Sequence, residues 1–313
     1  MTELEYWNSQ FLPAALALAI NMLFWREGLL ARMFSRPQRI AMRFIDLLDQ
    51  RYNKDELSTK TLRSEGVSIL ILVSIIAVLS GLILSTAFSK IPYGWVLNAA
   101  IMSTMLNVGA LMGELKTLKG AIERSHEEGS ATLAYFSGID TSQTESPFLA
   151  SAVIQYFALE YRRSVIAPII YFLFFGLSGL FLVKAIAIAN QLVGHHTKHR
   201  KKFGWAFTKA RTIVVWPIAP ISAIFISITA AFFGWKSLLA AIIWAFRGAK
   251  LHPYTAEGWT EGAIAGALAV QLSPERRYEH SKLSVPLIGP KGKWGPRGSW
   301  PEAHDILRTR LLF

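Results

Sequence analysis

Four long stretches of the chain contain no charged residue, and they limit the fold more than any other feature of the sequence. They cover residues 67–89, 91–113, 164–183 and 212–235. The hydrocarbon core of a bilayer is about 30 Å thick, and a helix of about 20 apolar residues crosses it. Each stretch is therefore long enough to span. A shorter apolar stretch, 11–24, predicts either a short first span or a helix in the membrane interface.

Composition agrees with a membrane protein and excludes several other classes. Hydrophobic residues make up 52% of the 313 residues, charged residues 17%, and cysteine is absent. These values exclude a disordered chain, a disulfide scaffold, a thiolate zinc site and a cysteine nucleophile. We expect an all-α, polytopic integral membrane protein with four or five spans plus re-entrant or interfacial helices, folded as a single domain over 1–313.

Most of the charged residues lie between the apolar stretches, in segments 25–65, 114–163, 184–211 and 247–313. Segment 184–211 holds seven Lys and Arg residues and no acid, whereas 114–163 is weakly acidic. Basic loops favour the cytoplasmic side, so we expect these polar segments to be mainly cytoplasmic in a multi-pass protein of the bacterial inner membrane. The net charge of +12 predicts a bilayer with anionic headgroups as partner. No nucleic-acid recognition motif accompanies this charge, so nucleic acid is not an expected partner.

A simple count of spans places the basic segment 184–211 opposite the first basic segment, so an extra crossing or a returning arm is expected. Lys184 and Lys236 each follow a long apolar run and precede ten further uncharged residues. Each of these second runs is a candidate for the returning arm of a broken or re-entrant hairpin. The short apolar run 147–159 is a third candidate.

Familiar catalytic and nucleotide-binding motifs are missing from the sequence. There is no Walker loop, no GxGxxG, no HExxH and no GxSxG. His195, His196 and His199 form an HHxxH pattern, but the neighbouring Lys and Arg residues repel a cation. This pattern favours an anion-binding patch, and we predict no metal site. The Gly-rich segment 289–298 is interpreted as a flexible basic loop.

Ionisable residues beside the spans are candidate functional groups, because charge near hydrocarbon is costly. Glu160, Arg162 and Arg163 directly precede the third long span. Glu160 is either a buried acid paired with one of the arginines or an interfacial charge. Lys184 and Lys236 are expected to extend their ammonium groups toward lipid headgroups.

Several segments, in order along the chain, resemble the CobD/CbiB family of membrane proteins. The most specific is GWTEGAIAGALAVQLSPERRYE at 258–279, with its small-residue helix. LVGHHTKHRKKFGWAFTKAR at 192–211 is similar to the family's MVGY…FGWAAAR segment, and SGIDT at 137–141 is similar to its GRDT motif. RPQRIAMRFIDLLDQRYN at 36–53 and the tail PLIG…PEAHDI complete the resemblance, which keeps its order over nearly the whole chain.

The resemblance implies an enzyme of cobalamin biosynthesis similar to adenosylcobinamide-phosphate synthase. Such an enzyme uses ATP and Mg²⁺ to join the carboxylate of adenosylcobyric acid to an aminoalkyl phosphate or amino alcohol, so a corrinoid is an expected partner. By resemblance, the catalytic residues are Asp140, Thr141 and Glu160. The substrate-binding residues implied in the same way are Gly194, His195, His196, Gly204, Trp205, His252, Pro253 and Glu261.

The chain also departs from the family pattern at residues expected to carry chemistry. The family's His, Arg, Asn and Asp-Asp are replaced by Arg36, Ile139, Tyr161 and the pair Arg211 and Thr212. Its Asn-Thr-Leu-Asp reads Ala187 to Asn190. Replacing paired acids removes metal ligands and adds a repelling charge, so these changes imply an altered site with weak or lost activity.

Two other functions remain as alternatives. The stretches VIAPIIYFLFFG and WPIAPISAIF are also similar to AmpE, a membrane protein linked to β-lactamase signalling. That likeness implies a catalytically silent subunit that works with another membrane protein. A transporter is less favoured, because few ionisable residues lie inside the apolar stretches.

Overall fold

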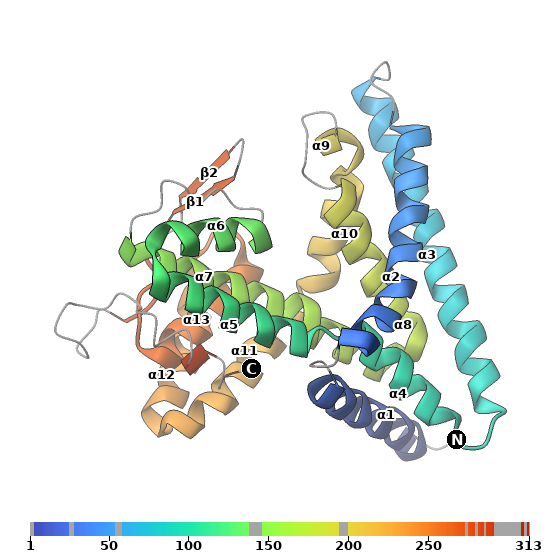
Figure 1. Ribbon diagram of the computed structural model, residues 1–313, viewed down its shortest axis with the longest axis horizontal. Coiled ribbons are helices and arrows are strands. Elements are labelled where there is room, and N and C mark those ends of the chain that lie inside the picture. Colours follow the sequence, from blue (N-terminus) through green and yellow to red (C-terminus); the bar gives the residue numbers. More distant parts are fainter. Residues whose placement is uncertain are drawn as a thin grey trace. The chain divides into compact units, whose positions relative to one another are not determined.

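The computed structural model of the protein is helical almost throughout (Figure 1). It describes residues 3–24, 28–53, 58–137, 146–193, 200–272, 275–278, 281–284, 286–290, 308–309 and 312. The prediction of an all-α membrane fold is confirmed by these helices. Within the described ranges, the additions are a short antiparallel hairpin of strands β1 (Glu275–Tyr278) and β2 (Ser281–Ser284) and an isolated antiparallel bridge between Leu272 and Ile288.

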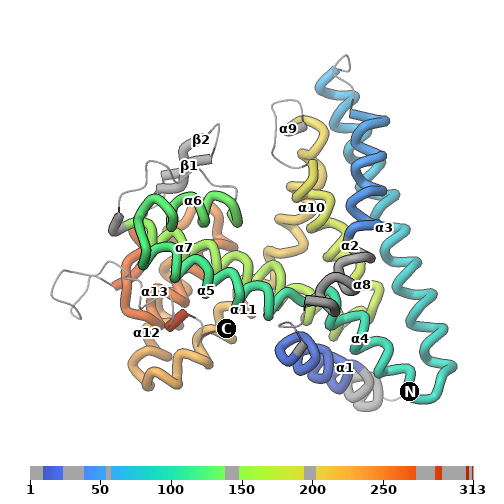
Figure 2. The backbone as a smooth tube through the Cα atoms, in the orientation of Figure 1, coloured from blue at the N-terminus to red at the C-terminus, as the bar shows by residue number. Residues whose placement is uncertain are grey.

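The chain forms two compact units, and each unit combines two separate parts of the sequence. Unit 1 comprises Met1–Gly109 and Ser164–Val215, and unit 2 comprises Ala110–Arg163 and Trp216–Phe313. In Figure 2, the blue segments belong to unit 1, and the orange and red segments belong to unit 2. The expectation of one domain over 1–313 stays a prediction.

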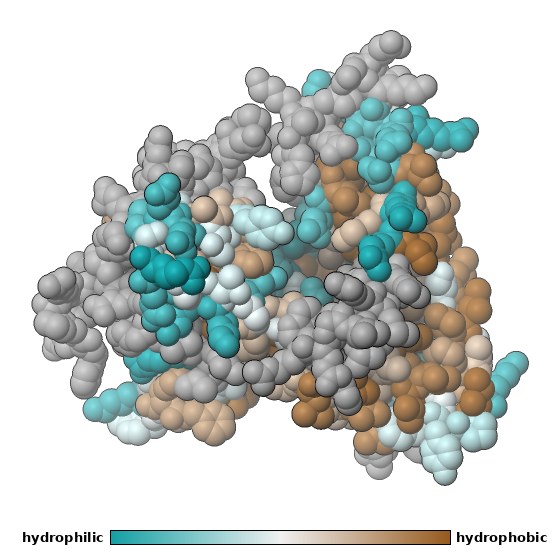
Figure 3. Space-filling model, in the orientation of Figure 1, coloured by the Kyte–Doolittle hydropathy of each residue, from teal (hydrophilic) through white to brown (hydrophobic). Residues whose placement is uncertain are grey.

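Unit 1 is built on long apolar helices. Its elements are α1 (Glu3–Phe24), α2 (Gly28–Tyr52), α3 (Thr59–Ser89), α4 (Gly94–Met105), α8 (Ala167–Val193), α9 (Arg200–Phe203) and α10 (Trp205–Val215). Large apolar side chains of α3 such as Ile75 and Ile83 are exposed, and Figure 3 shows hydrophobic surface over this helix. An exposed apolar face of this length is the surface expected to contact lipid.

The predicted spans correspond to helices of the structure. Three helical stretches are long and apolar enough to cross a membrane: Thr59–Ser89, Gly94–Arg124 and Phe148–Val193. A fourth results if Trp205–Val215 and Ile218–Phe233, which are joined at a bend, cross together. The predicted first span, 11–24, falls within a shorter apolar helix, Gln10–Leu23.

The second of these stretches is interrupted between α4 and α5 (Val108–Arg124). The side chain of Asn21, on α1, forms hydrogen bonds with backbone groups at this break. Asn21 Nδ2 donates to the carbonyls of Ser103 (2.8 Å) and Leu106 (2.9 Å), and its Oδ1 accepts from Gly109 N at 3.1 Å. In an apolar environment each unsatisfied backbone group costs several kcal/mol, so this one buried amide permits the break.

The breaks that Lys184 and Lys236 suggested differ in their distance from the lysine, and the two hairpins themselves stay predictions. The helix α8 continues through Lys184 to Val193, and its only non-helical residue is Gly176, at φ 58° and ψ −147°. Glycine tolerates this conformation because it has no Cβ. By contrast, a break does fall directly before Lys236, where Gly234 has φ 117° and separates α11 from α12. The third candidate, 147–159, lies in α7, which leads into a π-helix and α8.

The α-helices of unit 2 are 12 to 17 residues long, and two of them are packed closely together. Its elements are α5, α6 (His126–Ser137), α7 (Ser146–Glu160), the start of the π-helix η1 (Tyr161–Ile166), α11 (Ile218–Ala230), the 3₁₀ turn η2 (Ala231–Phe233), α12 (Trp235–Leu251), α13 (Thr255–Leu268) and the two strands. Helix α13 is buried along most of its length and packs against α7, α11 and α12.

Glycines spaced four residues apart allow α13 to approach α12. A Cβ added to Gly258, Gly262 or Gly266 would overlap a backbone carbonyl of α12. For Gly262 that carbonyl belongs to Trp244. Small residues on the facing sides of two helices let their backbones pack closely.

We expect Gly262→Val to destabilise unit 2, because the added side chain must push α12 and α13 apart. Overpacking of this kind costs about 1–3 kcal/mol. The matched control is Gly120→Ala on α5, whose Cβ would meet only the Arg124 guanidinium at 3.6 Å. Thermal unfolding of the purified chain in detergent measures both. An unfolding midpoint for Gly262→Val equal to that of the control would contradict this packing.

Candidate functional site

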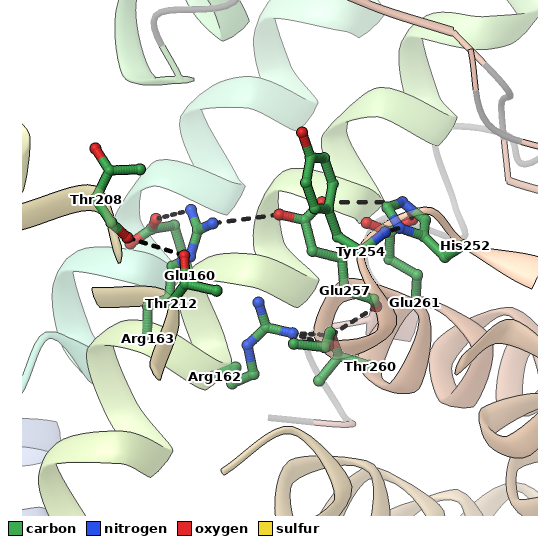
Figure 4. Close-up of polar contacts among 11 residues, drawn as sticks. Glu160, Arg162, Arg163, Thr208, Thr212, His252, Tyr254, Glu257, Thr260 and Glu261 are labelled. Carbon is green, nitrogen blue, oxygen red and sulfur yellow. Dashed lines mark hydrogen bonds and ion pairs between the residues drawn. The ribbon is translucent and has the colours of Figure 1, made fainter. Parts of the chain in front are cut away.

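Three side chains that can bind a cation converge where α12 ends and α13 begins (Figure 4). His252 caps the C-terminus of α12, and Glu257 and Glu261 lie one turn apart on one face of α13. His252 Nε2 is 3.8 Å from Glu257 Oε2 and 3.9 Å from Glu261 Oε2. One ligand atom from each residue lies within 4.8 Å of the other two.

This cluster is buried. The side chains of His252 and Glu261 have no exposed surface, and that of Glu257 is 14% exposed. Tyr254 N donates to His252 Nδ1 at 2.9 Å, and Nε2 has no hydrogen-bond partner among the described residues. A neutral imidazole carries one proton, so the proton lies on Nε2. The buried N–H therefore faces two carboxylates without being hydrogen-bonded to either.

Helix α7 provides a second side of the site. Gln155 Nε2 donates to Glu261 Oε2 at 3.2 Å, which orients this fully buried carboxylate. One residue further, Tyr156 donates its hydroxyl to Glu114 Oε2 of α5 at 2.9 Å. Both bonds join helices that are far apart in sequence, so they fix carboxylates within unit 2 rather than stabilise one helix.

Two arginines reach α13 from the π-helix η1. Arg162 is 2% exposed and donates to the Thr260 hydroxyl at 3.2 Å and to the carbonyl of Ala256. Arg163 forms ion pairs with Glu257 at 3.4 Å and with Glu160 at 3.9 Å. A π-helix adds a residue to the turn and occurs often at functional sites. Here it ends α7 at the point where both guanidinium groups face α13.

The charges of this cluster suit a ligand that has both cationic and anionic parts. Three carboxylates, of Glu160, Glu257 and Glu261, lie with two guanidinium groups. Carboxylate oxygens bind metal ions, and guanidinium groups bind phosphate or carboxylate. A metal-bound phosphate ester and the carboxylate of a substrate are both compatible with this arrangement.

The structure brings together three of the site residues predicted from sequence. Glu160, His252 and Glu261 belong to one cluster, in which Arg163 and Glu257 connect them. Glu160 is paired with Arg163, which is one of the two interpretations left open for it. Pro253 lies exposed in the turn between His252 and α13, and its side chain offers no polar atom to the cluster.

Two of the other predicted residues are described in unit 1, and the rest lie outside the described residues. Gly204 and Trp205 belong to unit 1, where the Arg63 guanidinium lies 5.3 Å from the centre of the Trp205 ring. The remaining predicted residues lie outside the described residues: Asp140, Thr141, Gly194, His195 and His196.

Sequence reasoning missed Glu257 and Gln155. Glu257 had a detectable signal, because it precedes Glu261 by four residues and therefore shares its helix face. Gln155 had none, since its partner Glu261 is 106 residues away along the chain.

Comparisons with known proteins agree with one another. A family profile described as "CobD/Cbib protein" matches residues 14–303. "Cobalamin biosynthesis protein CobD" of a Sinorhizobium species is 28% identical over 282 residues, which cover 89% of this chain and 87% of that protein. Its namesake from Brucella suis is 24% identical over 305 residues, covering 96% and 91%. A Rhodobacter capsulatus protein of the same name is 31% identical over 151 residues, covering 48% and 46%. No solved structure gives a significant match.

We expect Arg162→Met to destabilise the chain by about 2 kcal/mol or more, because hydrogen bonds from a charged group contribute about 1.5–3 kcal/mol. The Thr260 hydroxyl and the Ala256 carbonyl would lose their buried donor. Arg124→Met is the control, since the Arg124–Glu128 pair is exposed and contributes about 0.5 kcal/mol. Denaturant titration in detergent measures the difference. Equal losses in the two variants would show that Arg162 does not anchor α13.

Proposed function

Because the chain belongs to the CobD/CbiB protein family, we propose that it forms an amide bond in cobalamin biosynthesis. The reaction joins the carboxylate of adenosylcobyric acid to the amine of an aminoalkyl phosphate or amino alcohol at the expense of ATP. The observation that carries this proposal is the buried cluster of His252, Glu257 and Glu261 beside Arg163. It supplies both charges that ATP-dependent ligation requires.

The residues of the cluster fit the Mg²⁺ ion that ATP brings. Mg²⁺ prefers oxygen ligands and is often held by one or two carboxylates together with phosphate oxygens. Glu257 and Glu261 offer such a pair, and Gln155 orients the second of them. When bound, the ion neutralises charge on the phosphates during transfer.

The remaining polar groups have separate tasks in the proposed reaction. Arg163 is 27% exposed and can donate to a phosphate or carboxylate oxygen while it holds Glu160 and Glu257 in place. Glu160, at 24% exposure, is the most accessible of the three carboxylates. We assign it the proton that the amine must lose when its nitrogen attacks the carboxyl carbon, activated by phosphate from ATP, and the bond from that carbon to the phosphate oxygen breaks.

The altered residues of α10 make the proposed reaction slower than in relatives that keep the family's acids. Arg211 and Thr212 stand where the family carries two aspartates, as the resemblance implies. Thr212 donates its hydroxyl to the Thr208 carbonyl of its own helix at 2.9 Å, so it does not replace a carboxylate ligand. We therefore propose an enzyme whose acidic site is rearranged and depends on the carboxylates of Glu160, Glu257 and Glu261 in unit 2.

Complementation tests this function directly. In a bacterial strain that lacks the synthase, we expect the chain to restore conversion of cobinamide precursors to cobalamin. Glu257→Gln and Glu261→Gln should each lower the rate by about 100-fold or more, the loss typical of one electrostatic group in an active site. The control Glu127→Gln changes an exposed carboxylate of α6 and should keep full activity.

A chain that reaches the membrane but restores no cobalamin synthesis would contradict this function. That result would favour the catalytically silent subunit suggested by the likeness to AmpE. Membrane content is measured for every variant, so that loss of activity is separated from loss of protein.

We also propose that the protein resides in the bacterial inner membrane and binds anionic headgroups through unit 1. The exposed Arg63 guanidinium lies over Trp205, which is 40% exposed, and Lys209 is exposed one turn further along α10. Trp and basic residues are typical of the membrane–water interface. Arg63 also precedes the apolar part of α3 by only three residues, which places it at the end of that span.

Phosphatidylglycerol should therefore stabilise the purified chain more than phosphatidylcholine does. In the double variant Arg63→Gln with Lys209→Gln, we expect the extra stabilisation to fall by about 1 kcal/mol per charge removed. Unfolding in mixed detergent–lipid micelles measures this, with Arg124→Gln as the control. An unchanged preference for phosphatidylglycerol would contradict a headgroup site at this position.

A further inference from the structure

The two nitrogens of His252 determine which metals the buried cluster can bind. A histidine with two glutamates at these separations has the composition of a zinc site. Zinc, however, needs the lone pair of an imidazole nitrogen that carries no proton. Since Tyr254 N donates to Nδ1, the lone pair of that nitrogen is already engaged. The proton lies on Nε2, which is the nitrogen that faces Glu257 and Glu261.

The surroundings of the ring keep it in this tautomer. The hydrogen bond to Nδ1 comes from the backbone two residues ahead, so it is set by the turn between α12 and α13 rather than by a mobile side chain. The His252 side chain is fully buried, and its Cβ lies where a side chain on Gly258 would be. Exchanging the two nitrogens would leave the Tyr254 N–H without its acceptor, which costs about 1–3 kcal/mol if that group is buried.

We propose that Glu257 and Glu261 bind a hard divalent cation, Mg²⁺ or Mn²⁺, through oxygen alone. His252 remains outside the coordination shell and donates its Nε2–H to an oxygen ligand of that cation, a water molecule or a phosphate oxygen. Oxygen-only sites favour Mg²⁺ and Mn²⁺, whereas imidazole favours Zn²⁺, Ni²⁺ and Cu²⁺. The role of the cation in ligation rests on the proposed function, but the site itself rests on the geometry of these three side chains.

Charge supports a cation at this position. The three carboxylates of the cluster exceed its two guanidinium groups by one negative charge, and Glu261 has no exposed surface. Carboxylates that converge in this way repel one another, and a cation bound between Glu257 and Glu261 would offset that repulsion. The unbonded Nε2–H is the independent sign that a ligand oxygen belongs beside these two carboxylates.

Binding of Mn²⁺ alone to the purified full-length chain in detergent tests the site without any turnover. Electron paramagnetic resonance measures free Mn²⁺ during titration, and Mg²⁺ is added as a competitor. We expect Glu257→Gln and Glu261→Gln each to weaken Mn²⁺ binding about tenfold or more, and Glu127→Gln to leave it unchanged. His252→Asn keeps an N–H donor and should stay within about threefold of the unchanged chain. Thermal unfolding shows which variants are folded.

Spin-echo modulation of the bound Mn²⁺ reports directly on its ligands. We expect no coupling to a directly coordinated imidazole nitrogen. Such a coupling would show that His252 is a ligand and would overturn its assignment as a donor. Mn²⁺ binding that is absent, or unaffected by Glu257→Gln, would overturn the cation site.

The same titration separates this inference from the ligase reaction. Mn²⁺ binding that depends on Glu257 and Glu261, in a chain that restores no cobalamin synthesis, supports the cation site and counts against the proposed ligation. Ligase activity in a chain whose Mn²⁺ binding is unchanged by Glu257→Gln and Glu261→Gln would overturn the cation site and support the proposed function.

Discussion

The close approach of α12 and α13 is the contact on which the candidate site depends. Glycines at 258, 262 and 266 bring the two backbones together, and a Cβ at any of them would overlap a carbonyl of α12. Because the helices are this close, His252 at the end of α12 faces the glutamates of the first turns of α13. Small residues at these positions thus allow the close backbone contact between α12 and α13 on which the site depends.

Burial of so many polar groups is stable only because helices distant in sequence satisfy them. Gln155 of α7 bonds Glu261, and Arg162 and Arg163 enter from a π-helix that is longer by one residue per turn than an α-helix. The α7 segment and α13 are separated by nearly 100 residues, so the site forms only when unit 2 is complete. Asn21 shows the same principle in unit 1, where one amide satisfies a break between two helices.

The sequence predicted the spans well because the absence of charge over about 20 residues is a local property, readable without knowledge of neighbours. Breaks were harder to predict: the interruption of α8 lies at Gly176, eight residues before the lysine that suggested it. Glycine permits a kink, but packing decides whether one forms. In the site, His252 and Glu261 were found by resemblance and Glu257 was missed, although it shares a helix face with Glu261. The contact of Gln155 with Glu261 depends on tertiary structure and left no sequence pattern.

The retained and the replaced acids of this chain belong to different structural units, and this changes what the replacements mean. Arg211 and Thr212, which by the resemblance stand in place of the family's aspartates, lie on α10 of unit 1. Glu160, Glu257 and Glu261, with both arginines, lie in unit 2, where ion pairs join Arg163 to Glu160 and Glu257, and Gln155 donates to Glu261. A degenerate protein would be expected to lose the costly buried charges first, since an unused buried carboxylate only destabilises the fold. Their presence, held by ion pairs and hydrogen bonds within unit 2, is the physical argument for the proposal that this cluster binds a ligand.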